Sequence, residues 1–248
     1  MSDHQEKLLA EAVFKPLGDS ALIVQIGIGI HPNIQKRVYA LSEWMNCHPF
    51  TGFIESVPAY NNVTIFYHPI IVCQNAPANL TPYEFVCHYV KKVIKQLDIE
   101  TNQQERCIDI PVLYGGKYGP DLEYVAQYHN LSVEEVIMIH SREEYLVYML
   151  GFAPGFPFLG GMDEIIATPR KKTPRLSIEQ GSVGIAGKQT GIYPLKTPGG
   201  WQIIGRTPLS LFHPSKSSPT LLHPGDKIRF VSISQEEFDR YREMSECL

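Results

Sequence analysis

Residues 181–206 read GSVGIAGKQTGIYPLKTPGGWQIIGR, in which glycine alternates with small apolar residues, prolines and aromatic rings. They lie within residues 151–226, which hold 12 of the 19 glycines and 10 of the 19 prolines. Glycine and proline at this density interrupt helices and favour short strands separated by turns. Many short strands at turn-rich intervals are typical of a closed or nearly closed β-barrel, so we expect one in this half of the chain.

The first hundred residues have a different pattern, because apolar strands alternate there with amphipathic helices. The expected strands are 14–17, 21–26, 52–57 and 63–67, and they pair as two hairpins. Pro32 opens an expected helix that ends near Asn46. Thr81 and Glu84 form a capping box for a second helix, in which apolar residues recur at helical spacing. The sequence therefore predicts a compact two-layer α+β domain with four strands under two helices.

A polar stretch, TNQQER at 101–106, separates the two patterns. It divides the chain into an α+β domain at 1–104 and a β-barrel domain at 105–248. In the second part the expected strands are 108–112, 145–150, 202–204 and 227–231, and the expected helices are 120–129, 132–140 and 235–246. The fold class is α+β.

Composition excludes several classes of protein. The net charge of -4, without a basic or acidic block, argues against nucleic acid as a partner. The N-terminal residues contain no apolar signal segment, and the longest uncharged span is broken by prolines, so we expect no membrane helix. Five scattered cysteines without CxxC spacing favour free thiols in a reducing cytoplasm.

Several familiar sites are missing from the sequence. A phosphate-binding GxxxxGK[ST] loop is absent, since Gln189 follows Lys188 where a hydroxyl residue would hold Mg2+. A complete dinucleotide fingerprint, HExxH and GxSxG are absent as well. The nine histidines show no metal-ligand spacing, so no metal site is expected.

The loop GFAPGFPFLGG at 151–161 carries three aromatic rings among small and rigid residues. Glycine permits close backbone approach and proline keeps the loop out of a helix. Phe152, Pro154, Phe156 and Phe158 are therefore candidates for a preformed groove or a partner surface. The alternative is a tight barrel corner with core aromatics, and composition does not choose between the two.

A basic stretch, TPRKKTPR at 168–175, places four cations in six residues. Residues 151–226 contain eight Lys and Arg but four Asp and Glu, a balance opposite in sign to that of the whole chain. A positive groove in an acidic protein favours a small anionic ligand. The alternative is a solvated loop.

Polar residues around the glycine-rich strands are the remaining candidates for a ligand site. Backbone amides in such loops can bind an oxyanion, and arginine suits carboxylate or phosphate. We assign catalytic roles to Lys188 and Arg206. The expected substrate-binding or nucleotide-binding residues are Arg175, Gln189, Thr190, Tyr193 and Trp201. The alternative is that these residues are ordinary parts of barrel strands and turns.

Together, GFAPGFPFLGGMD, TPRKKTPR, GSVGIAGKQTGIYP, TPGGWQIIGRTP and LHPGDKIRF resemble the family that contains the 5-oxoprolinase B subunits, the kinase inhibitor KipI and allophanate hydrolase subunit 1. PLGDSALIV, ESVPAYNNVTIFYHP and PVLYGGKYGPDLEYVA extend the likeness over nearly the whole chain. The resemblance implies an α+β N-terminal domain and a cyclophilin-like β-barrel, without implying prolyl isomerase activity.

The resemblance also implies a function and partners. It indicates a non-autonomous subunit that works with A-type and C-type subunits to open 5-oxoproline to glutamate with ATP. ATP would be shared with those subunits, and Mg2+ could accompany it. The alternatives are an inhibitor of a sporulation histidine kinase and a carboxyltransferase-type subunit related to urea carboxylase.

Overall fold

The computed structural model describes residues 12–29, 31–97 and 106–246. The chain divides into two compact units, residues 1–104 and 105–248. Each unit has its own hydrophobic core. Among the described residues, no helix combines the length and apolarity that a membrane span requires.

The N-terminal unit contains one antiparallel sheet with the strand order β1-β2-β4-β3. The strands are β1 (Val13–Pro16), β2 (Ala21–Gln25), β3 (Phe53–Pro58) and β4 (Asn62–Tyr67), and the helices are α2 (Pro32–Cys47), α3 (Pro69–Asn75) and α4 (Pro82–Gln96). Both expected hairpins are present, as β1 with β2 and β3 with β4. One expectation was wrong, because the described residues of this unit form three helices where the sequence predicted two. The short α3 has no side-chain cap, so it lacks the signal that revealed α4.

The predicted capping box fixes the start of α4. The backbone N–H of Thr81 donates to Glu84 Oε2 at 2.9 Å, and Glu84 N–H donates to Thr81 Oγ1 at 3.3 Å. The Thr81 N–H, together with the Thr81 hydroxyl that donates to the same Glu84 oxygen at 2.8 Å, lowers the pKa of the Glu84 carboxyl. Beyond the cap, Val86, Val90 and Val93 are buried, as their helical spacing predicted. They join buried residues of α2 and the sheet in a single core, so the sheet and these helices form two layers.

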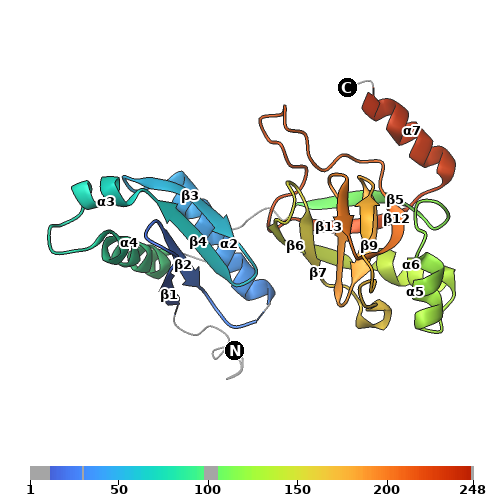
Figure 1. Cartoon of the computed structure of the whole chain (residues 1–248), viewed down its shortest axis with the longest axis horizontal. Coiled ribbons are helices and arrows are strands. Elements are labelled where there is room, and N and C mark those ends of the chain that lie inside the picture. The colour runs from blue at the N-terminus through green and yellow to red at the C-terminus, as the bar shows by residue number, and fades with distance from the viewer. Residues whose placement is uncertain (1–11, 30, 98–105, 247–248) are drawn as a thin grey trace. The chain divides into compact units, whose positions relative to one another are not determined.

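The C-terminal unit contains a closed seven-stranded barrel with the strand order β10-β7-β6-β13-β5-β12-β9 (Figure 1). Its strands are β5 (Cys107–Tyr114), β6 (Glu144–Leu150), β7 (Pro157–Gly160), β9 (Ser182–Ala186), β10 (Gln189–Ile192), β12 (Gln202–Arg206) and β13 (Lys227–Ser232). The prediction of a closed barrel is confirmed. A separate ribbon pairs β8 (Arg175–Ile178) with β11 (Thr197–Gly199).

In residues 106–246 the α-helices that accompany the barrel are α5 (Leu122–Tyr128), α6 (Val133–Arg142) and α7 (Gln235–Glu246). The capping box predicted at α6 is present, since Ser132 N–H donates to Glu135 Oε2 at 2.7 Å and Glu135 N–H donates to Ser132 Oγ at 3.1 Å. Figure 1 shows α5 and α6 side by side and α7 following β13 to the C-terminal end.

The barrel interior is filled by side chains and encloses a buried histidine. His140 is fully buried, with Nδ1 2.7 Å from Tyr114 Oη and Nε2 2.8 Å from Thr190 Oγ1. Its ring stacks on Phe230 with centroids 4.4 Å apart. Burial lowers the pKa of His140 to about 3, so the ring is neutral at physiological pH. A filled interior leaves the outer loops and ribbon as the place for a ligand site.

Candidate functional site

An open groove of about 320 Å3 lies on the C-terminal unit. It is lined by Phe152, Phe156, Phe158, Arg170, Pro174, Tyr193, Pro198, Gly199, Gly200 and Trp201. These residues come from the β6–β7 loop and β7, from the basic stretch before β8, and from the segment that follows β10 and includes β11. Segments up to about fifty residues apart therefore form one surface, which we call the aromatic groove.

Phe156 is the centre of the aromatic groove. Its ring makes edge contacts with Tyr193 and Trp201, with centroids 5.4 and 5.5 Å apart. Phe158 and Phe152 complete the cluster at 5.1 and 5.6 Å from Phe156. Edge-to-face packing of this kind adds about 0.5–1.5 kcal/mol per pair beyond area burial, so the groove wall is preformed.

The β6–β7 loop holds one ring inward and one outward. Phe156 is buried, whereas Phe152 is 71% exposed. Phe152 has a φ of 67°, a conformation that side chains other than glycine rarely adopt. Such a residue costs about 1–3 kcal/mol and marks positions where function constrains the backbone. The exposed ring at the groove rim is therefore a candidate contact for a ligand or a partner protein.

Two glycines make room for the rings. A Cβ on Gly191 would lie 3.1 Å from atoms of both Phe156 and Trp201. A Cβ on Gly199 would lie 2.4 Å from the Tyr193 hydroxyl. The glycine-rich pattern that predicted a barrel thus also permits close aromatic packing outside it.

Arg170 supplies the positive charge of the groove. Its guanidinium carbon lies 5.9 Å from the centre of the Trp201 ring, within cation–π range. Burial raises the pKa of Tyr193 to about 12, although Arg170 opposes the shift. The phenol is therefore neutral at physiological pH. The groove combines apolar rings with one cation, which suits a small ring compound that carries an anionic group.

A buried carboxylate anchors the basic stretch beside the groove. Asp121, with a side chain 6% exposed, accepts hydrogen bonds from Lys171 Nζ at 3.0 Å and Arg175 Nη2 at 2.8 Å. It also accepts the backbone N–H of Ile203 at 2.7 Å. Burial raises the pKa of Asp121, but these three donors outweigh it and hold the pKa below its usual value. Asp121 therefore fixes the segment that brings Arg170 into the groove wall.

The structure separates the residues that the sequence analysis had grouped. Phe152, Phe156, Phe158, Tyr193 and Trp201 line the aromatic groove. Pro154 is exposed on the same loop but is not a lining residue. Thr190 lies inside the barrel, where it contacts His140 and donates to Gly184 O at 3.1 Å. Arg175 donates to Asp121 and is not a lining residue, so it helps to hold the segment next to the groove.

The two predicted catalytic cations lie at opposite ends of β9. Arg206 is paired with Ser182 at the start of that strand. Lys188 follows the end of the strand, is 70% exposed and pairs with Glu164 at 2.7 Å. Gln189 begins β10 directly after this turn. The catalytic roles of Lys188 and Arg206 stay predictions, and the structure does not bring the two side chains together.

Sequence reasoning missed Asp121 and left Arg170 unassigned. Arg170 belongs to the basic stretch at 168–175, so the sequence showed its charge but not that it lies beside Trp201 in the groove. Asp121 stands 50 residues before Lys171 and 54 before Arg175, and no local motif joins them. Within the described ranges, no group of three or more His, Cys, Asp or Glu side chains is arranged to hold a metal ion.

One group of residues resembles a catalytic triad but has the wrong hydrogen bonding. Ser218 Oγ lies 3.3 Å from His223 Nε2, and Asp226 Oδ2 lies 3.8 Å from His223 Nδ1. Arg106 Nη1 also lies 3.1 Å from Nδ1. Because arginine only donates, Nδ1 must accept and the ring proton lies on Nε2. The imidazole therefore cannot take a proton from Ser218, and the group does not form a hydrolase site.

The class of protein follows from a match to a known family, since the family described as "Carboxyltransferase domain, subdomain C and D" matches residues 12–222, which include most of the barrel and all of the groove lining. The chain is 50% identical over 230 residues to the 5-oxoprolinase B subunit of Bacillus subtilis, covering 92% of this chain and 96% of that protein. It is 40% identical over 217 residues to the 5-oxoprolinase B subunit of Escherichia coli O157:H7, covering 87% and 93%. The chain therefore belongs to the carboxyltransferase subdomain C and D family, in the group of 5-oxoprolinase B subunits.

A solved structure agrees with this fold. The crystal structure of TTHA0988 matches with a TM-score of 0.73 and 34% sequence identity. The match covers 86% of this chain and 40% of that longer chain. The resemblance recognised in the sequence motifs is thus confirmed. Kinship of the barrel with cyclophilins stays a prediction.

Proposed function

We propose that this chain is the B-type component of an ATP-dependent 5-oxoprolinase, which opens 5-oxoproline to glutamate together with A-type and C-type subunits. The observation that carries the proposal is the 50% identity to a 5-oxoprolinase B subunit over 92% of this chain. Identity at that level over almost the full length of both proteins supports a shared role as well as a shared fold.

The aromatic groove is the proposed place for the substrate. 5-Oxoproline is a flat five-membered lactam with one carboxylate. Its methylene groups suit the aromatic lining of the groove, and its carboxylate suits Arg170, which lies over the Trp201 ring. The volume of about 320 Å3 falls at the small end of the range of roughly 300–1,000 Å3 that is typical of small-molecule sites.

The groove residues bind and orient rather than transfer protons. In the described part of the chain, the lining set includes no Asp, Glu, His or Cys. Tyr193, whose pKa burial raises to about 12, stays protonated and does not act as a base. A stable lactam needs a base for the attacking water, so we propose that another subunit supplies it. The exposed Phe152 ring then lies at the edge where that subunit would close the site.

ATP, when bound, supplies the phosphoryl group that activates the lactam oxygen toward hydrolysis. The sequence has no GxxxxGK[ST] loop to hold it, since Gln189 replaces the required hydroxyl residue. We propose that the nucleotide, with its Mg2+, is held jointly with the A-type and C-type subunits. Arg170 and the aromatic rings of this chain would keep the lactam in place and exclude water from its apolar face.

A reconstitution experiment tests the shared site. We expect ATP-dependent release of glutamate from 5-oxoproline only when the chain is combined with its A-type and C-type partners. Full activity of the purified chain by itself would contradict the shared site. In the complex, Arg170→Gln removes a charge-assisted contact, so KM for 5-oxoproline should rise roughly 10- to 100-fold.

Lys172→Gln is the matched control, because this exposed lysine of the same loop is not a groove-lining residue. We expect its kinetics to stay within about twofold of wild type, as for most surface substitutions. If Arg170→Gln also left KM unchanged, the aromatic groove would not be the substrate site. That result would leave the assignment to a 5-oxoprolinase complex standing, since reconstitution tests it separately.

The family description favours a second candidate, a carboxyltransferase-type subunit acting on urea or a related amide. Such a subunit would need a biotin-carrying partner. Activity of the complex that depends on biotin and not on 5-oxoproline would favour this candidate. Inhibition of histidine kinase autophosphorylation by the lone chain would favour the inhibitor alternative instead.

A further inference from the structure

A second cavity, of about 300 Å3, lies on the C-terminal unit between the end of β12 and helix α7. It is lined by Gln180, Gly181, Arg206, Thr207, Pro208, Leu209, Ser210, Phe238 and Arg242. None of these residues lines the aromatic groove. We call it the arginine pocket, because its charged lining residues are two arginines from different elements.

Arg206 is held in place with its donor edge unused. Its Nε–H donates to the carbonyl oxygen of Gln180 at 2.7 Å, which fixes the plane of the guanidinium group. The guanidinium carbon lies 6.0 Å from the centre of the Tyr118 ring. Among the described residues, no protein acceptor is within hydrogen-bond distance of the two terminal nitrogens of Arg206. A planar fork with free N–H groups in a cavity suits a bidentate oxyanion.

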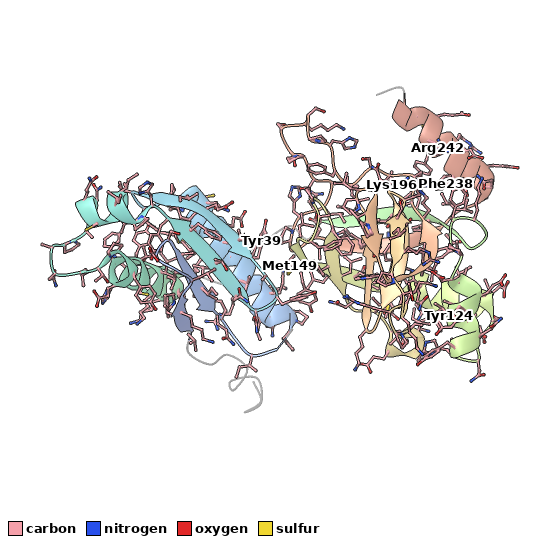
Figure 2. The ribbon with its side chains drawn as sticks, viewed as in Figure 1. Tyr39, Tyr124, Met149, Lys196, Phe238 and Arg242 are labelled. Atoms are coloured by element: carbon pink, nitrogen blue, oxygen red, sulfur yellow. The ribbon has the colours of Figure 1, made fainter. Side chains whose placement is uncertain are left out.

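The second arginine reaches the pocket from α7. Phe238 is 2% exposed and packs on Tyr118, with ring centroids 4.9 Å apart. Arg242 follows Phe238 by four residues on the same helix, so the two side chains share one face. Figure 2 labels both residues along α7. The contact that anchors the helix thus also places Arg242 beside the cavity.

The charge of the pocket indicates the kind of anion. Its lining residues carry two positive charges and no negative one. The adjacent Glu179 pairs with Lys196 at 2.7 Å, so that pair adds no net charge. Ser210 is already satisfied, because its Oγ accepts from Gln180 Nε2 at 3.1 Å and donates to Phe212 O at 3.2 Å. A lining with two guanidinium groups matches a doubly charged oxyanion better than a singly charged carboxylate.

We propose that the arginine pocket is a binding site for a phosphoryl group, either free phosphate or the phosphate end of a nucleotide. Arg206 would bind two phosphate oxygens with its terminal nitrogens, and Arg242 would approach a third from the α7 side. This site is distinct from the aromatic groove and does not depend on the substrate that the groove takes. It gives Arg206 a role in binding phosphate, in a different cavity from the rings with which the sequence analysis had grouped it.

Calorimetric titration of the intact chain tests the site without any partner. The probes are inorganic phosphate, pyrophosphate and ATP, with adenosine and acetate for comparison. We expect the three phosphate compounds to bind at low ionic strength, and adenosine and acetate to bind at least roughly tenfold more weakly, as loss of one charge-assisted contact implies. Stronger binding of ATP than of pyrophosphate would identify the nucleotide as the source of the phosphoryl group, and equal binding would identify the phosphate group alone.

Two variants locate the binding. Arg206→Gln and Arg242→Gln should each weaken phosphate binding roughly 10- to 100-fold, the range expected for loss of one charge-assisted contact. Arg242 is exposed on its helix, so its replacement should leave folding unchanged and guards against a misfolded Arg206 variant. Lys216→Gln removes one exposed positive charge elsewhere on the same unit and should bind as wild type does.

Three outcomes would overturn the proposal. The first is no detectable binding of phosphate or pyrophosphate at concentrations up to about 10 mM, beyond which affinity is too weak for a specific site. The second is equal loss of binding in the Lys216 control and the two arginine variants, which would indicate unspecific attraction. The third is acetate binding as tightly as phosphate, which would remove the preference for a phosphoryl group.

Discussion

Replacement of Asp121 tests whether a single buried carboxylate holds the groove together. Asp121→Asn would keep an oxygen for the Ile203 N–H, but an amide NH2, which only donates, would replace the oxygen that accepts from Lys171 and Arg175. Hydrogen bonds to charged groups contribute about 1.5–3 kcal/mol each, so losing two of them should cost about 3 kcal/mol. Asp121→Ala would also leave a buried N–H unpaired, which raises the expected cost to about 3–5 kcal/mol.

Solvent weakens the attraction between Asp121 and its two cations and so lowers both expected costs, because the side chains of Lys171 and Arg175 are 32% and 28% exposed. We therefore expect the lower end of each range in urea unfolding of the intact chain. Glu164→Gln is the control, since it breaks the ion pair with Lys188 in which both side chains are 70% exposed, and such pairs contribute about 0.2–1 kcal/mol. If Asp121→Ala unfolds within about 0.5 kcal/mol of wild type, Asp121 does not anchor the basic stretch.

Asp121 also makes the free energy of unfolding depend on pH, and the direction of that dependence follows from its lowered pKa. The pKa of Asp121 is lower in the folded chain than its unfolded value of about 3.9. Its stabilisation is therefore fully present above about pH 5 and is lost as the pH falls through the folded pKa. The difference in unfolding free energy between wild type and Asp121→Asn should shrink in acid. A difference that stays constant from about pH 6 to about pH 2.5 would refute the electrostatic explanation.

Three further predictions concern the groove and the core. Phe152→Gly relieves a positive φ, so the free energy of unfolding of the lone chain in urea should rise by about 1 kcal/mol. The same change removes the exposed ring at the groove rim, so the activity of the reconstituted complex should fall. Gly199→Ala forces a methyl group against the Tyr193 hydroxyl and should destabilise by about 1–3 kcal/mol, with a red-shifted emission of the groove tryptophan as its surroundings open. Burial lowers the pKa of His140 to about 3. Below about pH 6.5 the unfolded chain therefore binds a proton at this residue that the folded chain does not bind. The free energy of unfolding should accordingly fall by up to about 1.4 kcal/mol per pH unit between about pH 6 and about pH 4. His140→Gln, which can still contact Thr190, should lose that part of the slope.

Local chemistry accounts for the parts of the fold that the sequence predicted well. The capping boxes at Thr81 and Ser132 depend on side chains three residues apart, so both appear in the sequence and in the structure. The barrel followed from glycine and proline density, which acts residue by residue on the backbone. The seven-residue α3 has no cap and no long apolar stripe, and it was missed for that reason.

The sequence by itself determined the secondary structure around its capping boxes and turns, the closed barrel, and the family, because each depends on neighbouring residues or on an ordered set of motifs. Only the tertiary structure decided which side chains share a cavity. Barrel closure turns Thr190 inward to His140, brings Trp201 onto Phe156, and sets Arg206 and Lys188 at opposite ends of one strand. Those neighbours depend on strand register and on contacts between residues about fifty positions apart, such as Asp121 with Arg175, which no local pattern records.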